Sequence, residues 1–250
     1  QAIYGWAGAD VKRFQQEPAK EIILPQSYRV PRLVQHIADN ILSRIPDERR
    51  IKKEWQARDE EGDIYFGTSI EDVPLHEGQW LVLARYNDKL IKLKPLLKEM
   101  GIYFEYKNRK SYKTRLYDSI QNFTRWTKGD LLSITECKDL FEYFGKDFPG
   151  KEERMYDLKE FGYKPTQQWF EVFETEPEDS LYIRDMLQSG EKLSKEARVK
   201  LSTIHSAKGG EADNVLLILD NTKTIREAIE KSPDKEDEEN RIWYVGVTRT

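Results

Sequence analysis

The stretch VKLSTIHSAKGGEADNVLLILD, residues 199–220, contains two segments of strand character separated by a short polar loop. Residues 199–205 and 214–220 are both predicted to be strands, the second being apolar over most of its length. The loop combines hydroxyl, imidazole and ammonium side chains with the adjacent glycines Gly209 and Gly210. Glycine allows a backbone to approach a ligand closely, and amide-rich turns bind anions. The stretch therefore predicts two strands of a sheet joined by a loop able to contact phosphate.

The apolar patterns before residue 107 predict further strands that are separated by helices. Strands are expected at residues 21–24, 80–85 and 102–106, and WLVLAR at 80–85 is typical of a strand buried on both faces. Helical spacing of apolar residues follows Pro31, and a second helix is expected after Asn87 or Asp88. Buried strands that alternate with helices indicate an α/β fold with a parallel sheet and flanking helices.

Two local features modify this pattern. Pro95 lies inside the second predicted helix, which should end near Gly101, and predicts either a kink or a late helix start. Residues 107–195 are rich in charge, tryptophan and tyrosine, with helical spacing and no strongly apolar strand. We expect them to form a mostly helical insertion that interrupts the α/β domain.

The composition excludes several classes of protein. Aromatic residues make up 12% of the chain, which argues against disorder, and no apolar run reaches the roughly 18 residues of a membrane helix. The single cysteine, Cys137, cannot form an internal disulfide, and three histidines offer no metal cluster. The net charge of −4 confines any nucleic-acid surface to a local patch. We expect a cytoplasmic protein without membrane contact or a bound metal, and Cys137 is expected to serve packing.

Two arginines have side chains suited to phosphate oxygens. Arg29 follows Tyr28 in SYRVP, and Arg249 lies one turn beyond Val245 on a predicted final helix. The planar fork of a guanidinium matches phosphate geometry. Both residues also have a structural interpretation, Arg29 as a surface cation beside a half-buried ring and Arg249 as a helix-end cation that complements the helix dipole.

The loop after the strand at 199–205 offers several contacts. Thr203 and backbone amides near Gly209 can donate to phosphates, His205 and Lys208 can contact a nucleic-acid backbone, and Glu211 can accept from a ribose hydroxyl. The alternative is an ordinary polar loop between two elements. The G-x-x-x-x-G-K-[ST] order of a Walker A loop is absent from the chain.

Three further stretches leave two interpretations open. Tyr4 and Trp6 can stack on unpaired bases or form an aromatic pair in the core. YKNRKSYKTR, residues 106–115, has five basic residues and no acidic one, and is either a phosphate-binding patch or a solvated helix face. The acidic residues 234–240 are expected to form a solvated loop, and His36 and His76 are expected to be incidental.

Five stretches of the chain, taken in order, resemble the later motifs of superfamily-one DNA helicases of the UvrD/Rep/PcrA type. They are QAIYGWAGAD, LPQSYRVP, LARYND, LSTIHSAKGGEADNV and ENRIWYVGVTRT. The resemblance implies a RecA-like fold in which two motor domains grip ATP and each carries a helical insertion. It further implies that residues 1–19 are the tail of the first motor domain. Residues 20–106 and 198–250 would form the second motor domain, and residues 107–197 its inserted subdomain.

The resemblance also implies residue roles. Arg29 and Arg249 match arginine fingers, and Gln1 matches a glutamine that senses the γ-phosphate. Tyr28 matches a ring beside the adenine and Glu211 a ribose contact, with Gly209 beside them in the nucleotide-binding loop. The expected DNA contacts are Tyr4, Trp6, Arg85, Asn87, Thr203, His205 and Lys208.

The implied activity is ATP-driven, 3′→5′ movement on single-stranded DNA up to a duplex junction. ATP and Mg²⁺ would be cofactors of the intact protein, and the missing N-terminal motor domain would supply the Walker A and Walker B segments. We expect the chain alone to be inactive and to hold no nucleotide tightly. Two alternatives stay open, a non-enzymatic nucleic-acid-binding module and the motor part of an ATP-dependent nuclease.

Overall fold

The computed structural model describes residue 3, residues 25–50 and residues 54–250. The chain divides into two compact units, the first formed by residues 1–96 with 198–250 and the second by residues 97–197. The strand predicted at residues 21–24 lies outside the described residues.

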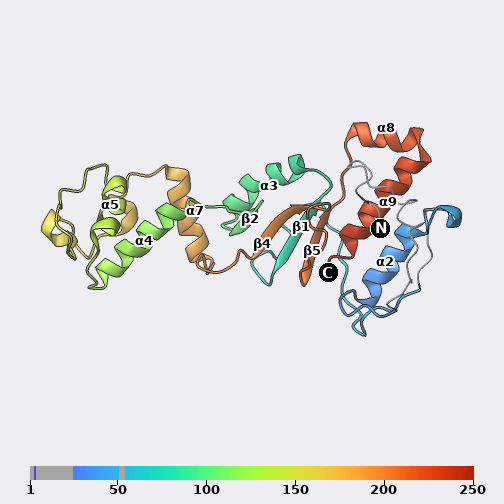
Figure 1. Ribbon diagram of the computed structural model, residues 1–250, viewed down its shortest axis with the longest axis horizontal. Helices are drawn as coiled ribbons and strands as arrows, with labels where there is room; N and C mark the ends of the chain where they lie inside the picture. The colour runs from blue at the N-terminus through green and yellow to red at the C-terminus, as the bar shows by residue number, and fades with distance from the viewer. Residues whose placement is uncertain (1–2, 4–24, 51–53) are drawn as a thin grey trace. The chain divides into compact units, whose positions relative to one another are not determined.

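The first unit is built around three parallel strands (Figure 1). β1 (Trp80–Ala84) lies between β4 (Val199–Thr203) and β5 (Asn214–Ile218) and pairs in parallel with both. All residues of β1 after Trp80 are buried, as expected for an apolar strand covered on both faces. The register aligns the last residues of the three strands, so their carboxyl ends meet at one edge of the sheet. The predicted parallel sheet is confirmed.

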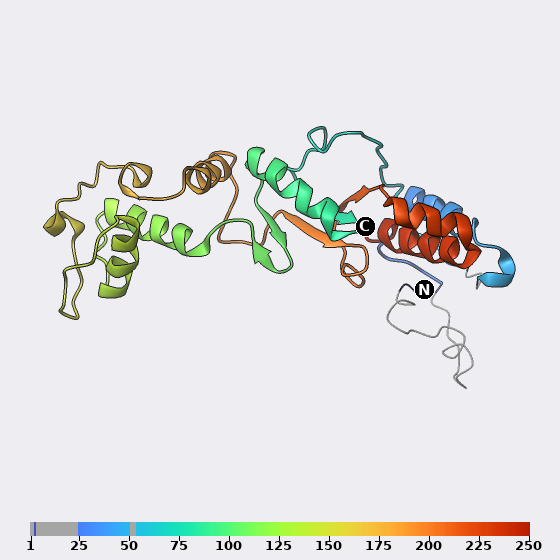
Figure 2. The same cartoon turned by 90° about the horizontal axis from the view of Figure 1, so that it is seen from above.

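Helices pack against this sheet and against one another. They are α2 (Arg32–Leu42), α3 (Asn87–Glu99), α8 (Lys223–Lys231) and α9 (Pro233–Val247), with a short 3₁₀ turn, η2 (Asp47–Arg49), after α2. Figures 1 and 2 both show α2 and α9 side by side, and the two helices are in contact. The core between helices and sheet is formed by small and branched side chains, including Ala38, Leu83, Ile204, Ile242 and Val245.

The second unit is mostly helical, which confirms the predicted helical insertion. Its elements are α4 (Thr114–Thr127), α5 (Ile134–Tyr143), η3 (Leu158–Phe161), α6 (Trp169–Val172) and α7 (Pro177–Gln188). A capping box between Ser133 and Glu136 begins α5. Phe141 packs edge to face against Phe144 in an aromatic core that also contains Phe123. Cys137 is buried in the same unit, and burial raises the pKa of its thiol to about 12, so it is an inert packing residue.

Two short strands, β2 (Phe104–Tyr106) and β3 (Arg109–Lys110), form an antiparallel hairpin in the second unit. Within the first unit the strand order is β4-β1-β5. β3 was not expected, because this strand has only two residues and both are charged. The interpretation of residues 106–115 as a helix face is therefore wrong, since α4 begins only at Thr114.

Two other expectations are also corrected. The acidic residues 234–240 belong to α9 rather than to a loop, and Asp237 and Glu239 are buried. Pro95 does not delay its helix, because α3 already begins at Asn87 and includes the proline. Within the described residues, none of the helices is both long enough and apolar enough to cross a membrane.

Candidate functional site

Arg29 lies in the turn that precedes α2. The Ser27 hydroxyl oxygen accepts from the backbone amide of Val30 at 3.1 Å and so holds the turn in place. The Arg29 guanidinium reaches Glu211, with 3.3 Å between Nη1 and Oε2. Its Nε is buried and has no hydrogen-bond partner in the described part of the chain. Arg29 therefore retains an unused donor next to its only described carboxylate partner.

Arg249 follows the last turn of α9 and is nearly buried, with 8% of its surface exposed. Its Nε donates to the Val245 carbonyl at 3.0 Å and its Nη1 to the Gly210 carbonyl at 3.4 Å. Burial and, next, the positive charge of Arg29 lower the pKa of Arg249. Arg29 and Arg249 contact adjacent residues of one loop, Glu211 and Gly210, although the two arginines are about 220 positions apart in the chain.

The loop between β4 and β5 is tied to the end of α9, which brings Glu211 to these arginines. The Ala212 amide donates to the Arg249 carbonyl at 3.1 Å, and the Thr250 hydroxyl donates to the Asp213 carbonyl at 3.3 Å. Gly209 has a φ of 94°, in the left-handed region that glycine enters without strain. The loop can therefore turn sharply and return to the amino end of β5.

Arg29, Glu211 and Arg249 together form what we call the arginine cluster. It contains two permanently charged guanidinium groups and one carboxylate, whose side chain is 65% exposed. Among the described residues, one positive charge is left uncompensated beside a buried donor without a partner. A phosphate group fits this arrangement, because it supplies the missing negative charge and accepts in the fork geometry of arginine.

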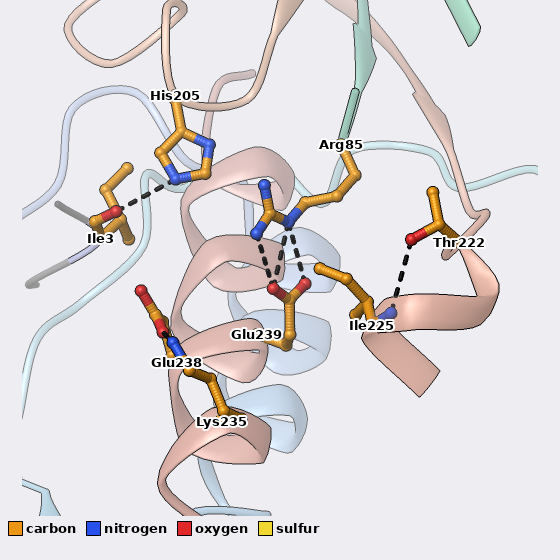
Figure 3. A network of polar contacts seen from close by, with 8 residues as sticks. All are labelled: Ile3, Arg85, His205, Thr222, Ile225, Lys235, Glu238 and Glu239. Carbon is orange, nitrogen blue, oxygen red and sulfur yellow. Dashed lines mark hydrogen bonds and ion pairs between the residues drawn. The ribbon is translucent and has the colours of Figure 1, made fainter. Parts of the chain in front are cut away.

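A second cluster lies at the carboxyl edge of the sheet (Figure 3). Arg85, directly after β1, forms a two-pronged bond with Glu239 of α9, with 2.9 Å from Nε to Oε2 and 2.7 Å from Nη2 to Oε1. Both side chains are largely buried, at 14% and 8% exposed. Burial disfavours the charged form of Arg85, and the bond and charge of Glu239 outweigh this, so the pKa of Arg85 is raised. We call this the Arg85–Glu239 pair.

His205 lies beside this pair, as Figure 3 shows. Its Nε2 is 3.0 Å from the Ile3 carbonyl oxygen, which can only accept, so Nε2 carries the hydrogen. Burial and the charge of Arg85 lower the pKa of His205. The imidazole is therefore neutral near pH 7.

Helix α8, also in Figure 3, begins where the Thr222 side chain accepts from the Ile225 amide at 3.4 Å.

The other expected DNA contacts lie close to this edge in the fold. Thr203 is the last residue of β4, and its hydroxyl is 2.9 Å from that of Ser206. Asn87 is the first residue of α3, and Lys208 is exposed in the loop after β4. The structure thus brings Arg85, Thr203 and His205 to one edge. It also commits the Arg85 guanidinium to Glu239, which sequence reasoning did not foresee.

Tyr28 presents its ring to solvent, with 88% of its surface exposed. It lines an open recess of about 480 Å³ together with Gln26, Arg58, Asp59 and Glu60. Arg58 was missed by sequence reasoning because no local pattern distinguishes it from other surface cations. Its Nη2 contacts Glu60 at 2.9 Å, and its Nε is buried without a partner among the described residues.

Gln1, Tyr4 and Trp6 lie outside the described residues. The γ-phosphate sensor and the base-stacking rings expected there are therefore not placed.

Comparison with known families matches residues 86–250, about two thirds of the chain, to the UvrD-like helicase C-terminal domain. The match begins at Tyr86 and includes Arg249 and the loop that contains Glu211. Arg29 and Arg85 precede the matched residues. No curated protein matches the chain.

Proposed function

The chain belongs to the UvrD-like helicase C-terminal domain family, and on this premise we propose that it is the C-terminal motor part of an ATP-dependent DNA helicase. In the intact protein, an N-terminal motor domain would supply the Walker A and Walker B segments and the magnesium ligands. The described residues contain no group of three His, Cys, Asp or Glu side chains suited to a metal ion. Movement in the 3′→5′ direction and a cytoplasmic location belong to this proposal through the family resemblance alone.

One observation carries the proposal: three distant parts of the chain build a cluster with surplus positive charge. Arg29 contacts Glu211, and Arg249 contacts the adjacent residue, Gly210. A guanidinium buried only for packing would be expected to have a full set of partners. Arg29 instead keeps one buried donor without a partner in the described residues.

ATP would supply a triphosphate whose transfer depends mainly on positioning and charge neutralisation. Arg29 and Arg249 would hold its terminal phosphate, and Tyr28 would offer an exposed ring to the adenine. Glu211 now bonds Arg29, so it must release that arginine before it can reach a ribose hydroxyl. By this exchange, Glu211 would control whether Arg29 is available to a phosphate.

The same loop and helix would link nucleotide to DNA. The loop begins beside Thr203 and His205, the proposed DNA contacts, and ends at the arginine cluster. Helix α9 carries Glu239 near its middle and is followed by Arg249 beyond its carboxyl end. A change at either site would therefore move elements shared with the other.

The test is to replace Arg29 or Arg249 by alanine in the full-length protein. We expect a loss of ATP hydrolysis of about 10³-fold or more, as for other arginine fingers, with single-stranded DNA binding retained. Arg32→Ala is the matched control, since Arg32 is an exposed arginine on the adjacent first turn of α2. Unchanged hydrolysis in both variants would overturn the proposal and favour a non-enzymatic nucleic-acid-binding module.

A further inference from the structure

The β2–β3 hairpin presents three cations on a tight turn. Lys107 and Asn108 have φ angles of 51° and 58°, the pair of left-handed residues that a type I′ hairpin turn requires. The register places Tyr106 opposite Arg109 and Glu105 opposite Lys110. All residues from 107 to 110 are exposed.

The base of this hairpin is anchored by buried groups. The Tyr182 hydroxyl donates to the Ile102 carbonyl at 2.6 Å and lies 2.7 Å from the Ser111 hydroxyl. The Ser111 amide closes the hairpin by donating to the Phe104 carbonyl at 2.9 Å. Tyr182 is buried, with 3% of its surface exposed. The tip is therefore held in a defined position within its unit.

The cations at the tip differ from the other basic residues of the same stretch. Lys113 pairs with Asp179 at 2.7 Å, and Arg115 pairs with both Asp139 and Glu142 at 2.6 Å. Among the described residues, no carboxylate lies within ion-pair distance of Lys107, Arg109 or Lys110. The two lysines contact tyrosines instead: the Lys107 ammonium is 5.3 Å from the Tyr106 ring, and the Lys110 ammonium donates to the Tyr112 hydroxyl at 3.2 Å.

We infer that the tip formed by Lys107, Arg109 and Lys110 is a contact for the phosphate backbone of DNA, separate from the loop at 203–211. Three exposed positive charges within four residues, without an acidic partner in the described part of the chain, are the footprint of a polyanion contact. A hairpin anchored at its base loses little conformational freedom when it binds. The inference rests on the proposed function for the choice of DNA as the polyanion.

The experiment measures DNA binding by the 250-residue chain as a function of salt, using fluorescence anisotropy with a labelled duplex that has a single-stranded tail. The test variant combines Lys107→Asn, Arg109→Gln and Lys110→Gln, because asparagine tolerates the left-handed conformation of position 107. The control combines Lys128→Gln, Lys146→Gln and Lys164→Gln, which removes three charges from exposed residues of the same unit. Circular dichroism confirms that both variants remain folded.

We expect the slope of log affinity against log salt to become less steep by about 2 to 3 in the hairpin variant, with little change in the control. A purely duplex or purely single-stranded oligonucleotide then identifies the strand form, since the expected change is about 2.7 for duplex and about 2.1 for single strand. Equal slopes in the two variants, or no binding by the unmodified chain at low salt, would overturn the inference.

This outcome is separable from that of the proposed function. Loss of ATP hydrolysis in Arg29→Ala with an unchanged salt slope in the hairpin variant would reject only the hairpin contact. The reverse combination would leave a DNA-binding hairpin on a protein without arginine fingers.

Discussion

Helix α9 joins two arginine-containing clusters that differ in how the charge of the arginine is compensated. At Glu239, one carboxylate meets one guanidinium, and both are nearly buried. Just beyond the carboxyl end of α9, Arg249 bonds the carbonyl of Gly210, and the exposed carboxylate of the next residue, Glu211, pairs with Arg29. The first cluster is complete within the chain, whereas the second has a surplus charge and a buried donor without a described partner.

Whether the charge of an arginine is compensated within the chain therefore distinguishes a structural arginine from a ligand-binding one. The amino-acid type alone does not make this distinction. A buried ion pair with matched geometry holds two elements together and leaves nothing for a ligand. A cluster with surplus charge is stable only because water or an added anion completes it. Arg85 therefore joins the end of β1 to α9, while Arg29 and Arg249 are the residues that we propose contact an anion.

The largest expected effect is on stability at the Arg85–Glu239 pair. Glu239→Ala leaves Arg85 buried without its carboxylate and should lower the free energy of unfolding by about 3–5 kcal/mol. Glu211→Ala removes an exposed partner of Arg29 and should cost less than about 1 kcal/mol. Urea denaturation of the two variants measures both quantities.

A double variant sharpens this contrast. Arg85→Met with Glu239→Leu removes both charges at once and should recover most of the stability lost in Glu239→Ala. Equal destabilisation by Glu239→Ala and Glu211→Ala would show that the two clusters do not differ in the way their burial indicates.

The next effect concerns anion binding at the arginine cluster. Tripolyphosphate at ten times its Kd should stabilise the chain by about 1.4 kcal/mol, seen as a rise of a few degrees in Tm. Arg29→Ala and Arg249→Ala should each abolish the rise, and Arg32→Ala should keep it. A rise that survives in both variants would place the anion elsewhere.

A smaller effect is expected from the carboxylate that now occupies Arg29. Glu211→Gln keeps the shape of the side chain and removes the charge that competes with an anion. The affinity for tripolyphosphate should increase about two- to fivefold, which corresponds to an exposed ion pair of less than about 1 kcal/mol. Isothermal titration calorimetry gives the affinity, and a weaker affinity in this variant would mean that Glu211 supports anion binding rather than opposing it.

The smallest effect is the pH dependence contributed by His205. Its pKa is lowered in the folded chain, so the unfolded chain takes up a proton first as the pH falls. The stabilisation is therefore complete above the unfolded value of about 6.5 and is lost as the pH falls below it. His205→Asn should lose less stability than the unmodified chain between pH 7.5 and 5.5, relative to its own value at pH 7.5.

His76→Asn is the control for this measurement, because His76 is exposed in a loop of the same unit. Its free energy of unfolding should change between pH 7.5 and 5.5 by the same amount as that of the unmodified chain. A pH dependence of His205→Asn identical to that of His76→Asn would exclude a role for burial at His205.

The strands of the first unit show where local sequence is sufficient. WLVLAR predicts β1 because a short unbroken apolar run is typical of a strand buried on both faces, and the residues of β1 after Trp80 are buried. The strand expected at 199–205 ends earlier, at Thr203, because the Ala207 amide turns back to the Thr203 carbonyl at 2.9 Å. That turn depends on a backbone contact that composition does not reveal.

The acidic residues of α9 show where local sequence fails. Their composition is typical of a solvated loop, yet Asp237 is 3.2 Å from Arg49 and Glu239 is bonded to Arg85. Both arginines come from segments far away in the sequence, so their pairing could not be read from residues 234–240. For the same reason, the bond of Arg85 to Glu239 could not be foreseen, and the DNA contact expected of Arg85 stays a prediction.

The sequence alone determined the chemistry that was available: apolar strands that form a parallel sheet, a glycine-containing loop, and motifs whose order along the chain resembles that of a helicase family. Only the tertiary structure decided which arginines are satisfied. Partners for Arg29, Arg85 and Arg249 are set by the packing of α9 against the sheet and by the return of the 204–213 loop. Charge compensation acts over a few ångströms in space, and such distances are fixed by the fold rather than by position along the chain.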